Sequence, residues 1–299
     1  MAIYVNTNIS SLNGRRYLNN VQNQLTTTYQ RLSSGLRINS AKDDAAGLQI
    51  SSRLTTQING LNQGNRNSND AIAFAQTAEG AMDEITGMLQ KVRTLAVQAN
   101  NGTNTADDKK ALGAEMNSLI NEVQRVVTKT TYGGKTILNG QQDNSLYKVD
   151  NKHADASITF QVGANSGDTI AMTMKNFALS KIVADNGKIF GIQTDGSAKI
   201  DLNGADTAPD KILAGIDAVI QSFDSERAAL GAFQNRLESS IRNQANVSAN
   251  QADARSRIRD ADFAEESANL SQQSIIQQAA TSMLMQANTR PMLGLALLG

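Results

Sequence analysis

The 299-residue sequence contains no cysteine and no tryptophan, and only 4% of its residues are aromatic. The absence of cysteine excludes disulfides and thiolate metal sites, and it suits both the cytoplasm and export of an unfolded chain that must not cross-link. Because large globular cores depend on aromatic surface, the shortage of aromatic residues favours thin seams between helices. This composition argues against an enzyme.

Charge of neither sign is in excess, since the chain has 28 basic and 28 acidic residues. Residues 1–66 are locally basic, but no aromatic side chains interleave with the basic residues in stacking positions, so we interpret this segment as a solvated helix face. No apolar run approaches the roughly 20 residues of a membrane span. We therefore expect no nucleic acid and no membrane among the partners.

The N-terminus also lacks the pattern of a cleaved secretion signal, so any export is expected to use a route that does not need a cleaved signal peptide.

Apolar residues recur at alternating intervals of four and three in long helical segments on both sides of a glycine-rich middle. The three series are Ile85, Leu89, Val92, Ala96 and Ala99, then Leu112, Met116, Leu119, Val123 and Val126, then Ile216, Ile220, Phe223, Leu230, Leu237 and Ile241. Arg227 and Gln234 occupy two positions of the last series. A period of about 3.5 residues is typical of a coiled coil. A chain that runs out as one helix and returns as another is expected to form a rod with both termini at the same end. Such a rod is expected to associate with other molecules through that end.

Turn residues divide these segments into elements. The pattern predicts helices at 5–33, about 44–99, 107–129, 210–254 and 258–289. Ser40 or Asp43 is expected to cap the second helix, and the last helix is expected to end before Pro291. Gly60 and Gly64 lie inside the second helix and are expected to weaken it by about 1 kcal/mol each.

The middle of the chain changes to a period of two. Residues 157–162 and 169–174 alternate in polarity and predict a β-hairpin at about 157–175, followed by a short variable surface segment at about 176–208. The sequence therefore predicts a mainly α protein, an elongated antiparallel coiled-coil or helical-bundle rod with a small β-hairpin region in the middle of the chain.

Five long segments resemble bacterial flagellin and follow the order of that family. They are residues 31–51 (RLSSGLRINSAKDDAAGLQIS), 89–105 (LQKVRTLAVQANNGTNT), 158–170 (ITFQVGANSGDTI), 256–271 (SRIRDADFAEESANLS) and 277–288 (QQAATSMLMQAN). Arg259, which stands where the family usually has an acidic residue, and the final ANTRPMLGLALLG depart from the family pattern. Only a short segment stands where many flagellins carry large outer domains, so the chain resembles a near-minimal member.

The resemblance implies a structural subunit that is exported unfolded and polymerises into the extracellular helical flagellar filament, for swimming motility. It implies an inner filament-core domain made of an N-terminal helix and spoke (1–43) and a C-terminal helix (255–299), beside a rod domain (44–254). Expected partners are other flagellin copies, an export chaperone at the C-terminal helix, cap and hook–filament junction proteins, and a host innate receptor of the Toll-like receptor 5 type. Two alternatives are a hook–filament junction protein of the same family and a secreted type III translocator or adhesin.

The resemblance also implies three sets of functional residues, none of them catalytic, cofactor-binding or metal-binding. The polymerisation and spoke motif comprises Arg31, Leu32, Gly35, Arg37, Ile38, Asn39, Ala41, Asp43 and Asp44. The patch for a subunit interface or the receptor comprises Gln90, Lys91, Thr94, Leu95, Gln98 and Glu115, with lysine at 91 where strong agonists have arginine. The hydroxyls available for O-glycosylation are Ser145, Ser157, Ser166, Thr169, Ser180, Thr194, Ser197 and Thr207. The single histidine, His153, is expected to be a solvated loop residue.

Overall fold

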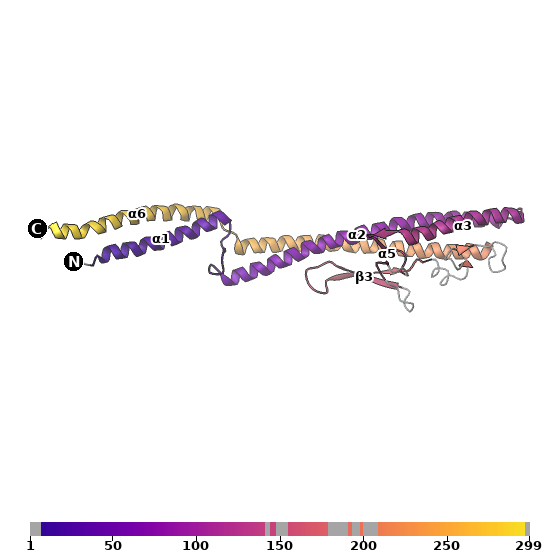
Figure 1. Ribbon diagram of the computed structural model, residues 1–299, viewed down its shortest axis with the longest axis horizontal. Coiled ribbons are helices and arrows are strands. Elements are labelled where there is room, and N and C mark those ends of the chain that lie inside the picture. Colours follow the sequence, from indigo (N-terminus) through magenta and orange to yellow (C-terminus); the bar gives the residue numbers. More distant parts are fainter. Residues whose placement is uncertain are drawn as a thin grey trace. The chain divides into compact units, whose positions relative to one another are not determined.

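Helices dominate the computed structural model, which describes residues 7–140, 144–147, 155–178, 191–192, 198–199 and 209–296 (Figure 1). The helices are α1 (Ile9–Ser34), α2 (Ala45–Ala99), α3 (Ala106–Lys129), α5 (Pro209–Arg259) and α6 (Phe263–Ala296). The strands form antiparallel pairs, β1 (Thr131–Tyr132) with β2 (Lys135–Thr136), β3 (Asp155–Gln161) with β4 (Thr169–Lys175), and β5 (Gly191–Ile192) with β6 (Ala198–Lys199). The predicted mainly α class with a small hairpin region is confirmed. His153 and most of the variable segment lie outside the described residues.

The chain divides into two compact units. The terminal unit comprises residues 1–58 and 248–299, and the central unit comprises residues 59–247. The expected boundaries at 43/44 and 254/255 differ from these because the first turns of α2 contact residues of the terminal unit. Arg255, for example, donates from Nη1 to the Thr55 hydroxyl at 3.4 Å.

The central unit is held by the seam that the heptad repeat predicts. All five α2 positions from Ile85 to Ala99 in the repeat are buried, as are Phe223, Leu230 and Leu237 on α5. The two helices run antiparallel, as three cross-helix polar pairs show: Arg93 with Asp217 at 2.6 Å, Asp83 with Arg227 at 2.9 Å, and Glu79 with Gln234 at 2.9 Å. Arg227 and Gln234 are therefore tolerated in the apolar repeat because each reaches an acidic partner on α2.

On α3 the buried stripe is wider than the predicted seam. Ile120 and Val127 are buried beside Met116 and Val123, whereas Leu112, Leu119 and Val126 are half-buried and pack against the same core. A stripe in which two adjacent positions are buried or half-buried at each turn is typical of the apolar face of a helix in a globular protein. Thr105 and Asp108 form a capping box that starts this helix.

The β3–β4 hairpin packs on α2 through aromatic rings and through two glycines. The Phe160 ring lies between Phe74 and Phe233, with centroid distances of 6.0 and 5.7 Å. A Cβ at Gly60 would lie 2.6 Å from the Cβ of Ala164, and a Cβ at Gly64 would lie 2.7 Å from the carbonyl carbon of Val162. These glycines do not interrupt α2. They make room for the backbone of the hairpin loop.

The predicted ends of the outer helices need correction. The first helix begins at Ile9 rather than residue 5, because Asn8 is its N-cap and accepts a hydrogen bond from the Ser11 N–H at 3.1 Å. The last helix begins at Phe263 rather than 258, because Asp262 accepts from the Ala264 N–H at 2.8 Å and caps it. Pro291 lies inside this helix, so the prediction that the helix ends before it was wrong. A proline inside a helix removes one i→i−4 hydrogen bond at a cost of about 3 kcal/mol, which weakens a helix without always ending it.

Candidate functional site

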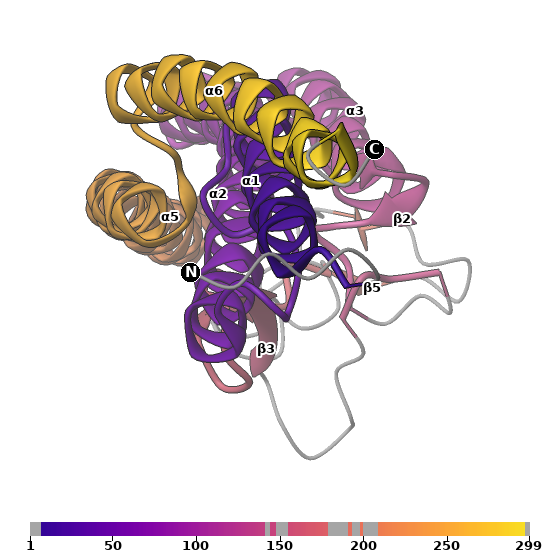
Figure 2. The ribbon, with the colours of Figure 1, turned by 90° about the vertical axis from the view of Figure 1, so that its left-hand side faces the viewer.

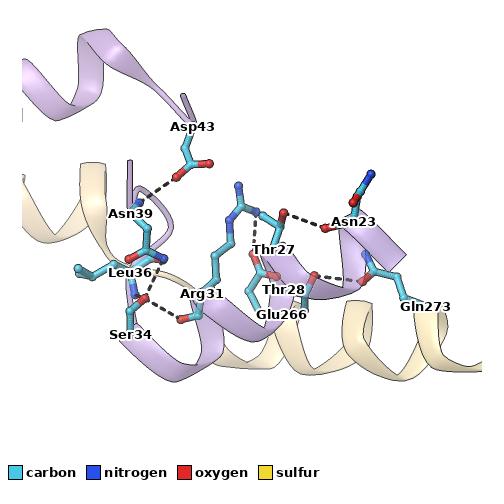
Figure 3. Close-up of polar contacts among 10 residues, drawn as sticks. All are labelled: Asn23, Thr27, Thr28, Arg31, Ser34, Leu36, Asn39, Asp43, Glu266 and Gln273. Atoms are coloured by element: carbon cyan, nitrogen blue, oxygen red, sulfur yellow. Dashed lines mark hydrogen bonds and ion pairs between the residues drawn. The ribbon is translucent and has the colours of Figure 1, made fainter. Parts of the chain in front are cut away.

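In the terminal unit, α1 and α6 lie side by side and antiparallel (Figures 1 and 2). Polar contacts between them include Asn8 with Ala287 O at 2.7 Å, Ser11 with Asn288 at 2.7 Å, Thr28 with Gln273 at 3.2 Å, and Arg31 with Glu266 at 3.0 Å. Figure 3 shows the last two of these pairs on facing turns. On α1 only Val21 and Thr28 are buried. This pairing fixes a register but buries little apolar surface.

Large apolar side chains of the terminal unit face solvent instead. The exposed set is Ile9, Leu12, Tyr17, Tyr29, Ile50, Phe263, Ile275, Met283 and Met285. Between α1 and α6 a groove of about 720 Å³ is lined by Gly14, Tyr17, Ala280, Met283 and Ala287, among others. Tyr17 and Met283 belong to both sets, so the groove presents exposed apolar side chains whose burial on a partner would be favourable.

The turn that follows α1 is built by the spoke motif. Gly35 has a φ of 71°, the left-handed conformation that glycine adopts without strain, and its N–H donates to Arg31 O at 2.8 Å. The backbone N–H groups of Arg37 and Ile38 both donate to the Arg259 carbonyl, at 2.7 and 3.3 Å. These bonds use only the backbone of residue 259, so they do not depend on which side chain stands there. The Ile38 side chain is buried, with 1% of its surface exposed.

Two adjacent aspartates close this turn in different ways. Asp43 accepts from the N–H groups of Asn39 and Ser40, and bonds from Ser40 and then Asn39 lower the pKa of the Asp43 carboxyl below its ordinary value of 3.8. Asp44 accepts from the Gly47 N–H at 2.9 Å and caps α2. The prediction of Ser40 or Asp43 as the cap was wrong, because the Asp43 carboxylate is turned back toward residues 39 and 40. Figure 3 shows its bond with Asn39. Of the rest of the motif, Leu32 is half-buried and Ala41 is exposed.

The predicted receptor patch lies on the central unit. Gln90, Lys91, Thr94 and Gln98 are exposed on α2, and Glu115 is exposed on α3. Leu95 is half-buried and packs against the hydrophobic core of this unit. Leu95 therefore contributes to the stability of the unit in addition to any contact with a partner.

The predicted glycosylation hydroxyls fall into three groups. Ser157, Ser166 and Thr169 are exposed on the hairpin. Ser145 is buried and its Oγ donates to Thr136 O at 3.5 Å, so it does not fit an acceptor for a glycan. The remaining members, Ser180, Thr194, Ser197 and Thr207, lie outside the described residues.

Within the part of the chain that the structure describes, no three His, Cys, Asp or Glu side chains are grouped so that they could hold a metal ion. The same part of the chain contains no helix that is both long and apolar enough to cross a membrane.

Known proteins match both ends of the chain. The model described as "Bacterial flagellin N-terminal helical region" matches residues 5–143, and "Bacterial flagellin C-terminal helical region" matches residues 213–298. Flagellin B of Vibrio anguillarum is 34% identical over 376 residues, which cover 100% of both chains. The chain belongs to the bacterial flagellin family. This is a family of structural filament proteins, not of enzymes.

A further curated relative is longer than this chain. Flagellin A of Vibrio anguillarum is 36% identical over 378 residues, again covering 100% of both chains. Because this alignment is longer than the 299 residues of the chain, it includes segments that this flagellin lacks. A solved structure, "Crystal structure of Bacillus cereus flagellin", is 25% identical, covers 60% of this chain and 88% of its own, and has a TM-score of 0.45.

Sequence reasoning missed three residues of the terminal unit. Glu266, which pairs with Arg31, and Asp262, which caps α6, both lie within the segment 256–271 that resembles flagellin. Gly47 is the third, since a Cβ there would lie 2.8 Å from Ile38 Cδ1. Glu266 could have been found from its charge, which is opposite to that of the spoke arginine.

Proposed function

We propose that this flagellin is the structural subunit of an extracellular helical filament that serves swimming motility, and that it reaches the filament after export as an unfolded chain. The observation that carries this proposal is the exposed apolar surface of the α1–α6 pair. A soluble monomer gains nothing from such a surface, whereas neighbouring copies bury it. The contacts are head-to-tail and do not close into a ring, so they extend a helix of subunits.

Folding of α1 and α6 is coupled to this assembly. Ordering each residue costs roughly 1–2 kcal/mol, and α1 buries only Val21 and Thr28 against its own chain. Surface from neighbouring subunits supplies the missing burial, so the two helices order as the filament grows. The proposal includes further partners. An export chaperone covers α6 before assembly, and cap and junction proteins bind at the filament ends.

Seeded assembly tests the proposal. Purified full-length monomer mixed with short filament seeds is expected to give long filaments by negative stain, and circular dichroism is expected to show a rise in helix content on assembly. A hook–filament junction protein, the alternative within the family, would bind seeds without elongating them. Monomer that stays monomeric with seeds and precipitating salt would contradict the proposed function.

We also propose that the exposed hairpin hydroxyls Ser157, Ser166 and Thr169 carry O-linked glycans on native filaments. The exposure of these three side chains leaves their hydroxyls accessible. The intact mass of subunits from native filaments is expected to exceed the mass of the bare chain, and peptide mapping should place the excess on residues 155–175. A mass equal to that of the bare chain would exclude the modification.

Recognition of free monomer by a host innate receptor is a further proposal for the α2–α3 surface. Lys91 replaces the planar guanidinium of strong agonists by a point charge, so we expect weak signalling that Lys91→Arg strengthens. Leu95→Ala is expected to abolish signalling by removing an apolar anchor. A receptor reporter assay measures both effects.

Since Leu95 also packs in the core, the Leu95→Ala monomer must be shown by circular dichroism to be folded before its signal is interpreted. Val126 on α3 provides a matched control, because it is half-buried and packs against the same core, eleven residues beyond Glu115, so Val126→Ala removes a comparable apolar group away from the patch. Folded Leu95→Ala monomer that signals like the parent chain would show that the site is misplaced.

A further inference from the structure

Asparagine followed by glycine is the dipeptide most prone to spontaneous loss of its side-chain amide, because the glycine N–H is unhindered by a Cβ. The sequence contains this pair at Asn13, Asn59, Asn101, Asn139, Asn186 and Asn203. The last two lie outside the described residues. The structure places the other four in very different surroundings, and these surroundings decide which one reacts.

Three of the four described Asn-Gly pairs are protected from loss of the side-chain amide by their surroundings. Asn13 and Asn59 lie inside α1 and α2, where the backbone geometry and the i→i−4 hydrogen bonds keep each glycine nitrogen away from the preceding side chain. Asn139 is buried, and the N–H of the following Gly140 donates to Asn176 Oδ1 at 3.3 Å. A nitrogen that is bound and buried is a poor nucleophile.

Asn101 lies in the exposed turn between α2 and α3. Asn101, Gly102 and Thr103 are all exposed, and a Cβ at Gly102 would meet no atom within 4 Å. The Thr103 N–H donates to Asn101 Oδ1 at 3.5 Å, which folds the carboxamide back over the Gly102 peptide. That oxygen is the atom on which negative charge develops when the carboxamide is attacked, so the Thr103 donor stabilises the transition state.

We propose that Asn101 is a site of spontaneous covalent modification in which the Gly102 backbone nitrogen attacks its side chain. Hydroxide removes the proton from the Gly102 N–H, and the nitrogen forms a bond to Asn101 Cγ. The bond from Cγ to Nδ2 breaks, and Nδ2 takes a proton and leaves as ammonia. Water then opens the resulting cyclic imide at either carbonyl, which gives aspartate or isoaspartate at position 101. No electrons are exchanged with an external reagent.

Both products change the turn. Either one places a carboxylate just beyond the C-terminal end of α2, where the helix carbonyls already carry partial negative charge. Isoaspartate also routes the main chain through the side-chain carbon, which displaces the Asn101 carbonyl that accepts from the Asn104 N–H at 3.1 Å. The modification is therefore expected to loosen the turn that connects α2 to α3.

The test is incubation of the purified full-length chain at mildly alkaline pH, followed by trypsin digestion and mass spectrometry. The peptide Thr94–Lys109 contains Asn101 and is expected to gain the mass of an amide-to-acid conversion, with fragmentation placing it at residue 101. In the folded chain Asn101 is expected to convert at least roughly tenfold faster than Asn59 or Asn139, equal to about 1.4 kcal/mol of barrier. Asn13 is not a suitable comparator, because the ordering of α1 depends on assembly.

Two controls separate the turn geometry from the dipeptide alone. In denaturant the rates at Asn59, Asn101 and Asn139 are expected to converge, because the surroundings that distinguish them are gone. Gly102→Ala adds a Cβ into open space and preserves the fold, yet it is expected to slow the reaction by hindering the nucleophile. Equal rates at the three sites in the folded chain, or an unchanged rate at Asn101 in Gly102→Ala, would overturn the proposal.

Discussion

A fragment comprising residues 44–254 is expected to remain folded, helical and monomeric while losing all ability to form filaments. The hydrophobic core that holds the central unit runs from Ala71 to Leu237 and lies entirely inside this fragment. The α1–α6 pair, with its exposed apolar side chains, is removed. Because the apolar contacts between neighbouring copies are proposed to lie on that pair, assembly should be lost completely rather than weakened.

Circular dichroism, sedimentation and seeded assembly of the fragment check this expectation against the full chain prepared in the same way. Chains of residues 44–299 and 1–254 extend the comparison, since each retains one terminal helix without its antiparallel partner. Both are expected to fail in assembly, because Arg31 and Glu266 come from opposite ends of the chain. Filaments grown from residues 44–254, or an unfolded fragment, would refute the expectation.

The helical class and the seams of the central unit could be predicted because packed helices bury residues at a fixed period. Ile85, Val92 and Ala96 follow that period and are fully buried on α2, as is Phe223 on α5. The partners of Arg227 and Gln234 could not be predicted, since they depend on how α2 and α5 align far apart in the sequence. A periodic pattern identifies the face of a helix that is buried but not the residues opposite it.

The spoke turn shows the same limit at short range. Asp43 and Asp44 are both good helix caps by residue type, and sequence alone does not distinguish them. The backbone of the turn brings the N–H groups of Asn39 and Ser40 to Asp43 and leaves Asp44 to cap α2. The sequence also does not tell which apolar side chains of α1 and α6 are exposed. Each of these helices has both buried and exposed apolar residues, and residue type alone does not separate the two kinds.

Gly64→Ala is expected to destabilise the central unit by about 1–3 kcal/mol, the cost of forcing a group into a filled site. Alanine favours the helix by about 1 kcal/mol over glycine, but here the new methyl group meets main chain. It would lie 2.7 Å from the Val162 carbonyl carbon and 3.3 Å from Gln244 Oε1. The hairpin loop cannot move aside freely, because the Asn67 amide donates to Gln161 O at 2.9 Å and the Val162 and Gly163 N–H groups bind Asp168 O.

Gly80→Ala on the same helix is the matched control, because a Cβ at Gly80 would meet no atom within 4 Å. It makes the same chemical change without the contact, and it is expected to stabilise the protein by about 0.4–1 kcal/mol. Thermal unfolding followed by circular dichroism should therefore move in opposite directions in the two variants. Hydrogen exchange of residues 155–175 should accelerate only in Gly64→Ala, as the hairpin lifts from α2. If both alanines raised the unfolding temperature, Gly64 would be an ordinary helix glycine and the hairpin would not depend on the space it provides.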